Sequence, residues 1–382
     1  MNSKAMVPAE TSLGNHSDIS LRAFTWNEDV LMEILLWLPA KSIIRFKLVC
    51  KRWLLLFSSD VFRHLHTLRC PKLQRSLILE TSTSLFFYFN PITDGDQRSM
   101  IPYNFPNPDP RIRVSCNGLM LLQSHFRDKS FYVYNPTTRQ SREIILPDTL
   151  SGDESVTEAL ALAFDPSKSP HYQVVSIRLL ATSVAEAGKT YNYQIDAYDS
   201  ESRTWKLSLG PITLLEELWI LQGAYLNGLI YWRMPSQYCS YDIARNEFKT
   251  FSRPSLPLNE DGFLFCHVQE SNGNLYQYKL SKEGECQSIM LFELDTDDRS
   301  SWLLKYHDVI SQSIRDAQPL IFTKGSDDTE TSSLVYHVSG KINRYSFLDK
   351  RIKELVDFTG ELFYEEEFGM KGYEFGECLA VV

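Results

Sequence analysis

Two kinds of hydrophobic pattern divide the chain near residue 75. From Glu28 to about His66 the apolar residues follow helical spacing, with only short interruptions. After Ser76, short runs rich in β-branched and aromatic residues alternate with clusters of Gly, Pro, Asn, Asp and Ser. The pattern therefore predicts a small helical bundle followed by a long all-β domain.

The first predicted helix is more apolar than a small bundle can bury. Between Val30 and Leu38 only Glu33 is polar. The spacing of a buried face is found at Leu31, Ile34, Leu35 and Leu38. Three further apolar residues lie off that face: Met32, Leu36 and Trp37. This surplus favours a partner protein that covers the helix, and the alternative is that the β domain covers it.

Capping residues predict where the helices begin and end. Asn27 can cap the first helix, and Pro39 ends it because the residue before a proline favours extended geometry. A second helix is expected from about Lys41, a third over residues 51–57 and a short fourth that Asp60 caps. Such short connections are typical of a helical bundle.

A recurring unit runs through the β part. A tyrosine followed by Asp, Asn or Ser precedes a polar turn and another strand, and this motif begins at Tyr134, Tyr198, Tyr241 and Tyr345. Asn-Gly pairs at residues 117–118, 227–228 and 272–273 predict tight hairpin turns. Periods of about 40–50 residues with four strands each are typical of a β-propeller, so we expect roughly six or seven blades. Sequential β-sandwiches are the alternative.

Composition and charge describe two modules. The 22 Phe, 19 Tyr and 7 Trp exclude disorder over most of the chain. The net charge of -9 argues against nucleic-acid and membrane partners, yet residues 41–75 hold nine basic side chains and one acidic one. This basic block has three interpretations: a solvated face, a nucleic-acid patch, or a surface that steers an acidic partner.

Cysteine spacing and the N-terminus predict a reducing compartment. Seven cysteines are dispersed without a C-x-x-C pair, which fits free thiols better than disulfides or a zinc site. The polar N-terminus lacks the apolar core of a signal peptide, and no apolar run approaches the roughly 18 residues of a membrane span. We therefore expect a cytoplasmic and/or nuclear protein.

Residues 26–66 resemble an F-box, especially the plant type. The resemblance lies in the order and spacing of Leu38-Pro39, Lys41-Ser42, Arg45-Phe46-Lys47, Val49-Cys50-Lys51 and Trp53. The β part resembles the F-box-associated, kelch-like interaction domain through residues 115–119, 134–139 and 163–166. The expected fold is thus an α+β multidomain chain: a disordered tail (1–23), a helical F-box (24–68) and an all-β propeller (76–382).

This resemblance implies the substrate-recognition subunit of a Skp–cullin–F-box E3 ubiquitin ligase. The F-box would dock on a Skp-type adaptor and through it on a cullin, and the propeller would bind the protein to be ubiquitylated, with no catalysis or cofactor of its own. By position, the adaptor-binding residues are Trp26, Val30, Leu31, Ile34, Leu38, Pro39, Val49, Cys50 and Trp53. Trp26-Asn27 replaces the family's usual Leu-Pro, which bears on adaptor binding. The alternatives are a carbohydrate-binding or enzymatic kelch-like propeller, and an F-box scaffold that acts outside the ligase.

Other reactive or aromatic groupings have simpler structural interpretations. Neither a phosphate-binding glycine loop nor a nucleophile elbow is recognisable in the sequence. A solvated, capping or strand role is favoured over metal binding or catalysis for His64-x-His66, Cys266-His267, Asp295/Asp297/Asp298 and Glu365–Glu367. A buried strand is the simplest interpretation of the run Phe86–Phe89. For Trp219, Trp232 and Trp302, packing in the blades and a role in recognition are equally good interpretations.

Overall fold

The computed structural model describes residues 28–69, 75–81, 85–89, 101–106, 110–124, 130–146, 156–185, 188–218, 223–253, 263–283, 286–295, 297–310, 317–325, 332–357 and 370–382. The predicted tail, the cap Asn27, Trp26, Trp219 and Glu365–Glu367 lie outside these residues. No helix in the described part is long and apolar enough to cross a membrane.

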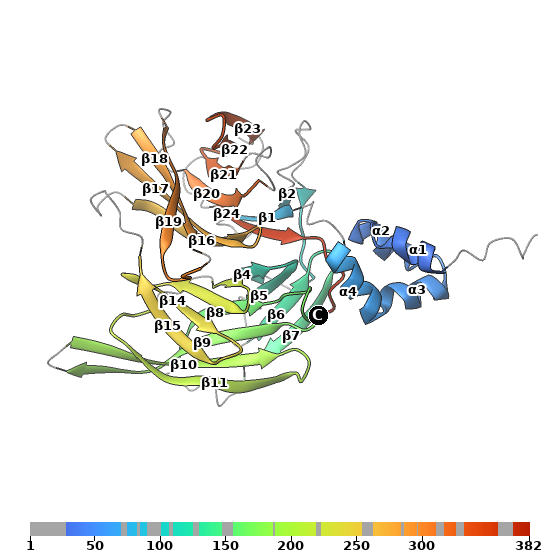
Figure 1. The fold of residues 1–382 in the computed structure, drawn as a ribbon, viewed down its shortest axis with the longest axis horizontal. Helices are drawn as coiled ribbons and strands as arrows, with labels where there is room; N and C mark the ends of the chain where they lie inside the picture. Colours follow the sequence, from blue (N-terminus) through green and yellow to red (C-terminus); the bar gives the residue numbers. More distant parts are fainter. Residues whose placement is uncertain are drawn as a thin grey trace, which may run out of the picture.

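Four short helices form a bundle at one side of the molecule (Figure 1). They are α1 (Glu28–Leu35), α2 (Ala40–Phe46), α3 (Lys51–Ser58) and α4 (Asp60–Arg69). An edge-to-face chain of aromatic rings joins α2, α3 and α4, running from Phe46 through Trp53 and Phe57 to Phe62 with ring centroids 5.2, 5.6 and 5.0 Å apart. The cap before α4 is Ser59, whose hydroxyl accepts a hydrogen bond from the Phe62 amide at 3.2 Å, and not Asp60 as predicted.

The β part is a propeller of six four-stranded blades. Blade I holds β4 (Pro110–Cys116), β5 (Leu119–Ser124), β6 (Ser130–Asn135) and β7 (Gln140–Ile145). Blade II holds β8 (Val156–Ala163), β9 (Gln173–Ala185), β10 (Gly188–Asp199) and β11 (Thr204–Leu214). Blade III holds β12 (Ala224–Leu226), β13 (Leu229–Arg233), β14 (Gln237–Asp242) and β15 (Glu247–Ser252).

The remaining blades complete the ring. Blade IV holds β16 (Phe263–Ser271), β17 (Asn274–Glu283), β18 (Cys286–Leu294) and β19 (Trp302–Ile310). Blade V holds β20 (Gln318–Thr323), β21 (Ser333–Val338), β22 (Lys341–Ser346) and β23 (Ile352–Asp357). Blade VI combines β24 (Met370–Gly376) with β1 (Arg75–Thr81), β2 (Phe86–Phe89) and β3 (Ile101–Pro102). The innermost strands β4, β8, β12, β16, β20 and β24 contact one another in sequence around a closed circle.

Pairing of the first strand with the last closes this ring. The antiparallel register runs from Arg75 opposite Gly376 to Thr81 opposite Met370, and Figure 1 shows β24 beside β1. The Tyr373 hydroxyl lies 2.9 Å from both the Glu80 carboxylate and the Ile112 carbonyl oxygen, which joins blade VI to blade I. Radial closure of this kind protects the strand edges that an open sheet would expose.

The recurring tyrosine motif is the end of the third strand of a blade and its turn into the fourth. After the tyrosine, the side-chain oxygen of Asn135, Asp199 or Asp242 accepts a backbone amide within the turn at 2.8 to 3.0 Å. Asp295 makes the same bond to the Asp297 amide at 2.9 Å, so the aspartate cluster of blade IV is one of these turns. Across the described residues, no three metal-ligating side chains gather.

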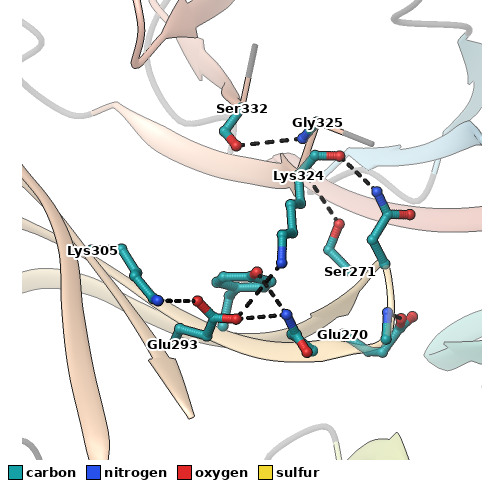
Figure 2. Close-up of polar contacts among 11 residues, drawn as sticks. Glu270, Ser271, Glu293, Lys305, Lys324, Gly325 and Ser332 are labelled. Atoms are coloured by element: carbon teal, nitrogen blue, oxygen red, sulfur yellow. Dashed lines mark hydrogen bonds and ion pairs between the residues drawn. The ribbon is translucent and has the colours of Figure 1, made fainter. Parts of the chain in front are cut away.

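Polar contacts at the inner turns hold blades IV and V together (Figure 2). The Asn272 side-chain amide donates to the Lys324 carbonyl oxygen at 2.9 Å, and the Lys324 amide donates to the Ser271 hydroxyl at 3.2 Å. The Glu293 carboxylate accepts the ammonium groups of Lys305 at 2.9 Å and Lys324 at 3.7 Å. The network therefore ties each turn to the neighbouring blade.

Two glycines with the same backbone conformation provide a test of ring closure. Gly118 and Gly228 both have φ +92, but a Cβ on Gly118 would lie 2.6 Å from the Gly376 carbonyl oxygen, whereas nothing lies within 4 Å at Gly228. We expect Gly228→Ala to cost about 1 kcal/mol through backbone strain alone, and Gly118→Ala to cost about 2–4 kcal/mol. Thermal unfolding of the two variants checks this difference, and equal midpoints would contradict it.

Candidate functional site

The helical bundle exposes a set of apolar side chains that its own core does not use. They lie on α1, on α3 and on the turn between α2 and α3: Val30, Ile34, Leu48, Val49, Leu54 and Leu55. The exposed fraction reaches 88% at Leu48 and 73% at Leu55. A hydrophobic set of this size on so small a bundle indicates a surface that a partner covers.

The residues predicted to bind an adaptor divide between this surface and the bundle core. Val30, Ile34 and Val49 belong to this surface, Cys50 is exposed next to Val49, and Pro39 is exposed at the border of the central cavity. Leu31, Leu38 and Trp53 are partly buried against the core cluster. Trp26 lies outside the described residues. Sequence reasoning missed Leu48, Leu54 and Leu55, although three successive leucines at 54–56 cannot all face the inside of one helix.

The buried face predicted for the first helix is wrong at two positions. Ile34 is half exposed, whereas Leu36 is 1% exposed. The helix ends at Leu35, and the next turn tightens through bonds from the Trp37 amide to the Ile34 carbonyl and from the Leu38 amide to the Leu35 carbonyl. The Leu36 amide still bonds to the Met32 carbonyl oxygen at 3.0 Å, so the turn tightens only after Leu36, which joins the bundle core.

A C-terminal segment, residues 377–382, lies between the bundle and the propeller. Its Leu379 is 2% exposed and belongs to the hydrophobic cluster of the helical bundle. On the other side, the Asn135 side-chain amide donates to the Ala380 carbonyl oxygen at 2.8 Å, and Arg142 donates to the Val382 carbonyl oxygen at 3.0 Å. The β domain therefore covers part of the apolar surplus, as the alternative proposed, and leaves the rest exposed.

An ion pair reinforces this junction. The Lys41 ammonium lies 2.7 Å from the Glu377 carboxylate and 4.9 Å from the centre of the Tyr88 ring. Burial lowers the pKa of Lys41, but its hydrogen bond to Glu377 and the nearby Tyr88 outweigh burial and raise that pKa overall. Lys41 thus stays charged where the F-box-like bundle meets blade VI.

His66 is buried at the same junction rather than solvated. The ring Nε2 lies 2.8 Å from the Leu38 carbonyl oxygen, so this side chain caps the turn after α1. Burial lowers the pKa of His66, although the hydrogen bond with Leu38 acts in the opposite direction. The ring has a packing and capping role here, which accounts for one of the two histidines of the His64-x-His66 pair.

A cavity of about 440 Å³ lies at the centre of the ring and is bordered on one side by the helical bundle. Trp37, Pro39 and His66 form that border, and residues of the inner strands form the walls. Gln269 crosses between blades: its side chain donates to the Glu374 carboxylate at 2.9 Å and accepts the Phe322 amide at 3.0 Å. The polar groups of this wall therefore hold the inner strands to one another.

Three of the described thiols are buried in surroundings that disfavour the thiolate. Cys116, Cys239 and Cys378 are buried and free. Burial raises the pKa of Cys116 to about 12 and that of Cys378 to about 11, and it also raises the pKa of Cys239. These three side chains are protonated at neutral pH. Cys266 and His267 are successive residues of β16, and their side chains lie outside the described part.

The described aromatic side chains singled out in the sequence lie on strands and pack within or between blades. Phe86 and Phe87 of β2 are buried, and Trp232 is 1% exposed. Trp302 packs on Tyr238 with ring centroids 5.0 Å apart. The strand predicted over residues 86–89 is confirmed, and for Trp232 and Trp302 packing in the blades is the arrangement observed.

Comparison with known families agrees with this architecture. Residues 26–65 match the F-box domain family, and residues 88–270 match the family described as F-box associated beta propeller domain. This chain is an F-box protein in which an F-box domain precedes an F-box-associated β-propeller. The F-box match begins at Trp26, so it includes the departure at Trp26-Asn27. The predicted family and fold class are confirmed, with six blades.

Several Arabidopsis thaliana proteins are similar to the chain. F-box protein At5g07610 is 28% identical over 375 residues, which cover 87% of this chain and 85% of that protein. F-box protein At5g49610 is 29% identical over 273 residues, covering 66% and 72% of the two chains. F-box/kelch-repeat protein At3g23880 is 26% identical over 253 residues, covering 59% and 65%.

We expect the Lys41–Glu377 pair to stabilise the junction. Lys41→Met keeps the apolar stem but leaves the Glu377 carboxylate, 9% exposed, without this cation, and should cost about 1–3 kcal/mol. The double variant Lys41→Met/Glu377→Gln should regain much of that loss. Thermal unfolding measures both. Lys341→Met is the control, since Lys341 pairs with Glu354 and Asp357 at an exposed site and should change little.

Proposed function

We propose that this protein is the non-catalytic substrate-recognition subunit of a Skp–cullin–F-box ubiquitin ligase. The F-box docks on a Skp-type adaptor, and through it on a cullin, while the propeller binds the protein to be ubiquitylated. The observation that carries this proposal is the exposed apolar set on α1, α3 and the α2–α3 turn of a matched F-box domain. A protein with this role acts in the cytoplasm and/or the nucleus.

Positively charged side chains beside the exposed apolar set also support docking of an adaptor there. Arg45 and Lys51 are exposed at the end of α2 and the start of α3, on either side of Leu48 and Val49. Cations around an apolar patch speed association with an acidic partner and oppose association with a basic one. The basic block is therefore assigned to steering an acidic adaptor.

The substrate surface is assigned to the propeller face away from the F-box. Strands alternate in direction within each blade, so the turns after the first and third strands lie on the face where the chain enters β1 from α4. The turns after the second strands and the links between blades lie on the other face. Loops on a rigid scaffold are where binding specificity is usually built. The exposed tip of the β9–β10 hairpin, with Val184 at 82% exposure, belongs to this face.

Adaptor docking predicts a large effect of charges within the apolar set. Ile34→Asp/Leu55→Asp should reduce recovery of a Skp-type adaptor in co-purification at least about tenfold, because buried interface anchors carry most of the binding energy. Both side chains are at least half exposed, so the fold should survive. Val184→Asp, on the propeller, is the matched control and should leave adaptor recovery unchanged.

Two results would contradict adaptor docking: equal recovery by the double variant and the control, or no adaptor recovered by the unmodified protein. Proximity labelling with and without proteasome inhibition then tests the ligase role. Labelled proteins whose abundance rises on inhibition, and whose half-life lengthens with Ile34→Asp/Leu55→Asp, are the expected substrates. Labelled proteins with unchanged half-lives would instead favour a scaffold outside the ligase.

A further inference from the structure

Leu379 completes the hydrophobic core of the helical bundle from the other end of the chain. In the described part of the protein, it is the one member of this core cluster that comes from outside residues 28–69, and it is 2% exposed. The cluster also contains Leu35 and Leu36 at the end of α1 and Phe57 of α3. Domains of about 40 residues are at the lower limit for folding alone. A leucine borrowed from the propeller is therefore a substantial part of this core.

The propeller holds the segment that carries Leu379. The Asn135 side-chain amide donates to the carbonyl oxygens of Cys378 at 3.3 Å and of Ala380 at 2.8 Å. The Cys378 amide donates to the Thr137 hydroxyl at 3.3 Å, and the Cys378 side chain is buried in a hydrophobic cluster of blades I and II. Leu379 thus enters the bundle between two residues that are fixed on the propeller.

Ring closure decides where this segment lies. The segment begins directly after β24, whose pairing with β1 runs from Arg75 opposite Gly376 to Thr81 opposite Met370. At its other end, β1 follows α4 of the bundle. The bundle is therefore joined to the ring both by the first strand and by the residues after the last one. Separation of β24 from β1 would withdraw Leu379 from the bundle core.

The helices that share this core also carry the exposed apolar set. Ile34 is next to Leu35 on α1, and Leu55 lies on α3 together with Phe57. Each of these helices has eight residues. Isolated helices shorter than about 12–15 residues are marginal in water, so α1 and α3 depend on packing. Loss of Leu379 would leave a cavity in that packing, and the surroundings of such a cavity collapse only partly.

We propose that the C-terminal segment couples adaptor docking to closure of the propeller. The F-box presents its apolar set in the form that binds only while residues 377–382, held by the closed ring, complete its core. A chain whose substrate-binding domain is open or unfolded is thereby kept from the adaptor. This coupling rests on the adaptor docking proposed above, and it adds a condition that the docking surface alone does not contain.

Substitutions within the segment test the coupling on the full chain. Leu379→Asp places a charge in the bundle core, outside the exposed apolar set, and should reduce recovery of a Skp-type adaptor at least about tenfold. Leu379→Met nearly preserves the side-chain volume and should keep most of the recovery. Val381→Asp is the control in the same segment, since Val381 is 44% exposed and lies outside the core cluster. Equal recovery by Leu379→Asp and Val381→Asp would contradict the coupling.

A matched pair of glycines tests the role of the ring. Gly118 lies between β4 and β5 of blade I, and a Cβ there would meet the Gly376 carbonyl oxygen and the Cys378 sulfur, each at 2.6 Å. Gly118→Ala should therefore displace the C-terminal segment and lower adaptor recovery severalfold. Gly228→Ala introduces the same backbone strain with nothing within 4 Å, and should leave recovery unchanged. Equal recovery by the two variants would overturn the link between the ring and the F-box.

Amide hydrogen exchange separates this coupling from adaptor docking, because it is measured without an adaptor. In Leu379→Asp, the amides of α1 and α3 should lose protection while those of the inner blade strands keep it. Unchanged protection of α1 and α3 would overturn the coupling, and so would a loss of protection throughout the chain. If the unmodified protein recovers no adaptor but the variant shows the loss confined to the helices, adaptor docking is refuted and the dependence of the bundle on the segment stands.

Discussion

The pairing of β1 with β24 is the contact on which the rest of the architecture depends. It closes the ring, and it also fixes the F-box, because α4 leads into β1 while the C-terminal segment leaves β24 at the same end. The two ends of the propeller therefore meet the helical bundle together. Leu379 enters the bundle core and Glu377 pairs with Lys41, so the orientation of the F-box is a consequence of how the ring closes.

This arrangement explains why a small bundle tolerates so apolar a first helix. Leu35 and Leu36 share a core with Leu379, which supplies apolar surface that the bundle of helices lacks. Ile34 faces the other way and remains half exposed. One face of the helix thus packs toward the propeller segment while another stays exposed, so covering by the β domain accounts for part of the apolar surplus of this helix.

The sequence predicted the local repeats better than the long-range contacts. Tyrosine-aspartate turns and Asn-Gly hairpins depend on a few neighbouring residues, so they identified the propeller. The copy in blade IV was missed because Leu294 replaces the tyrosine before Asp295. Leu36 is buried in a cluster that includes Leu379, a residue distant in sequence, so helical spacing alone could not predict its burial.

Several side chains of the basic block over residues 41–75 already form ion pairs within the protein. Lys41 is engaged with Glu377, Arg63 with Asp60 and Arg69 with Glu33, so these charges serve the junction and the bundle. The cations exposed beside the apolar set are at the α2–α3 turn. A surface that combines Leu48 and Val49 with flanking positive charge selects for an acidic, partly apolar partner. The net positive charge of the helical part therefore overstates the charge available for the proposed steering of an acidic adaptor.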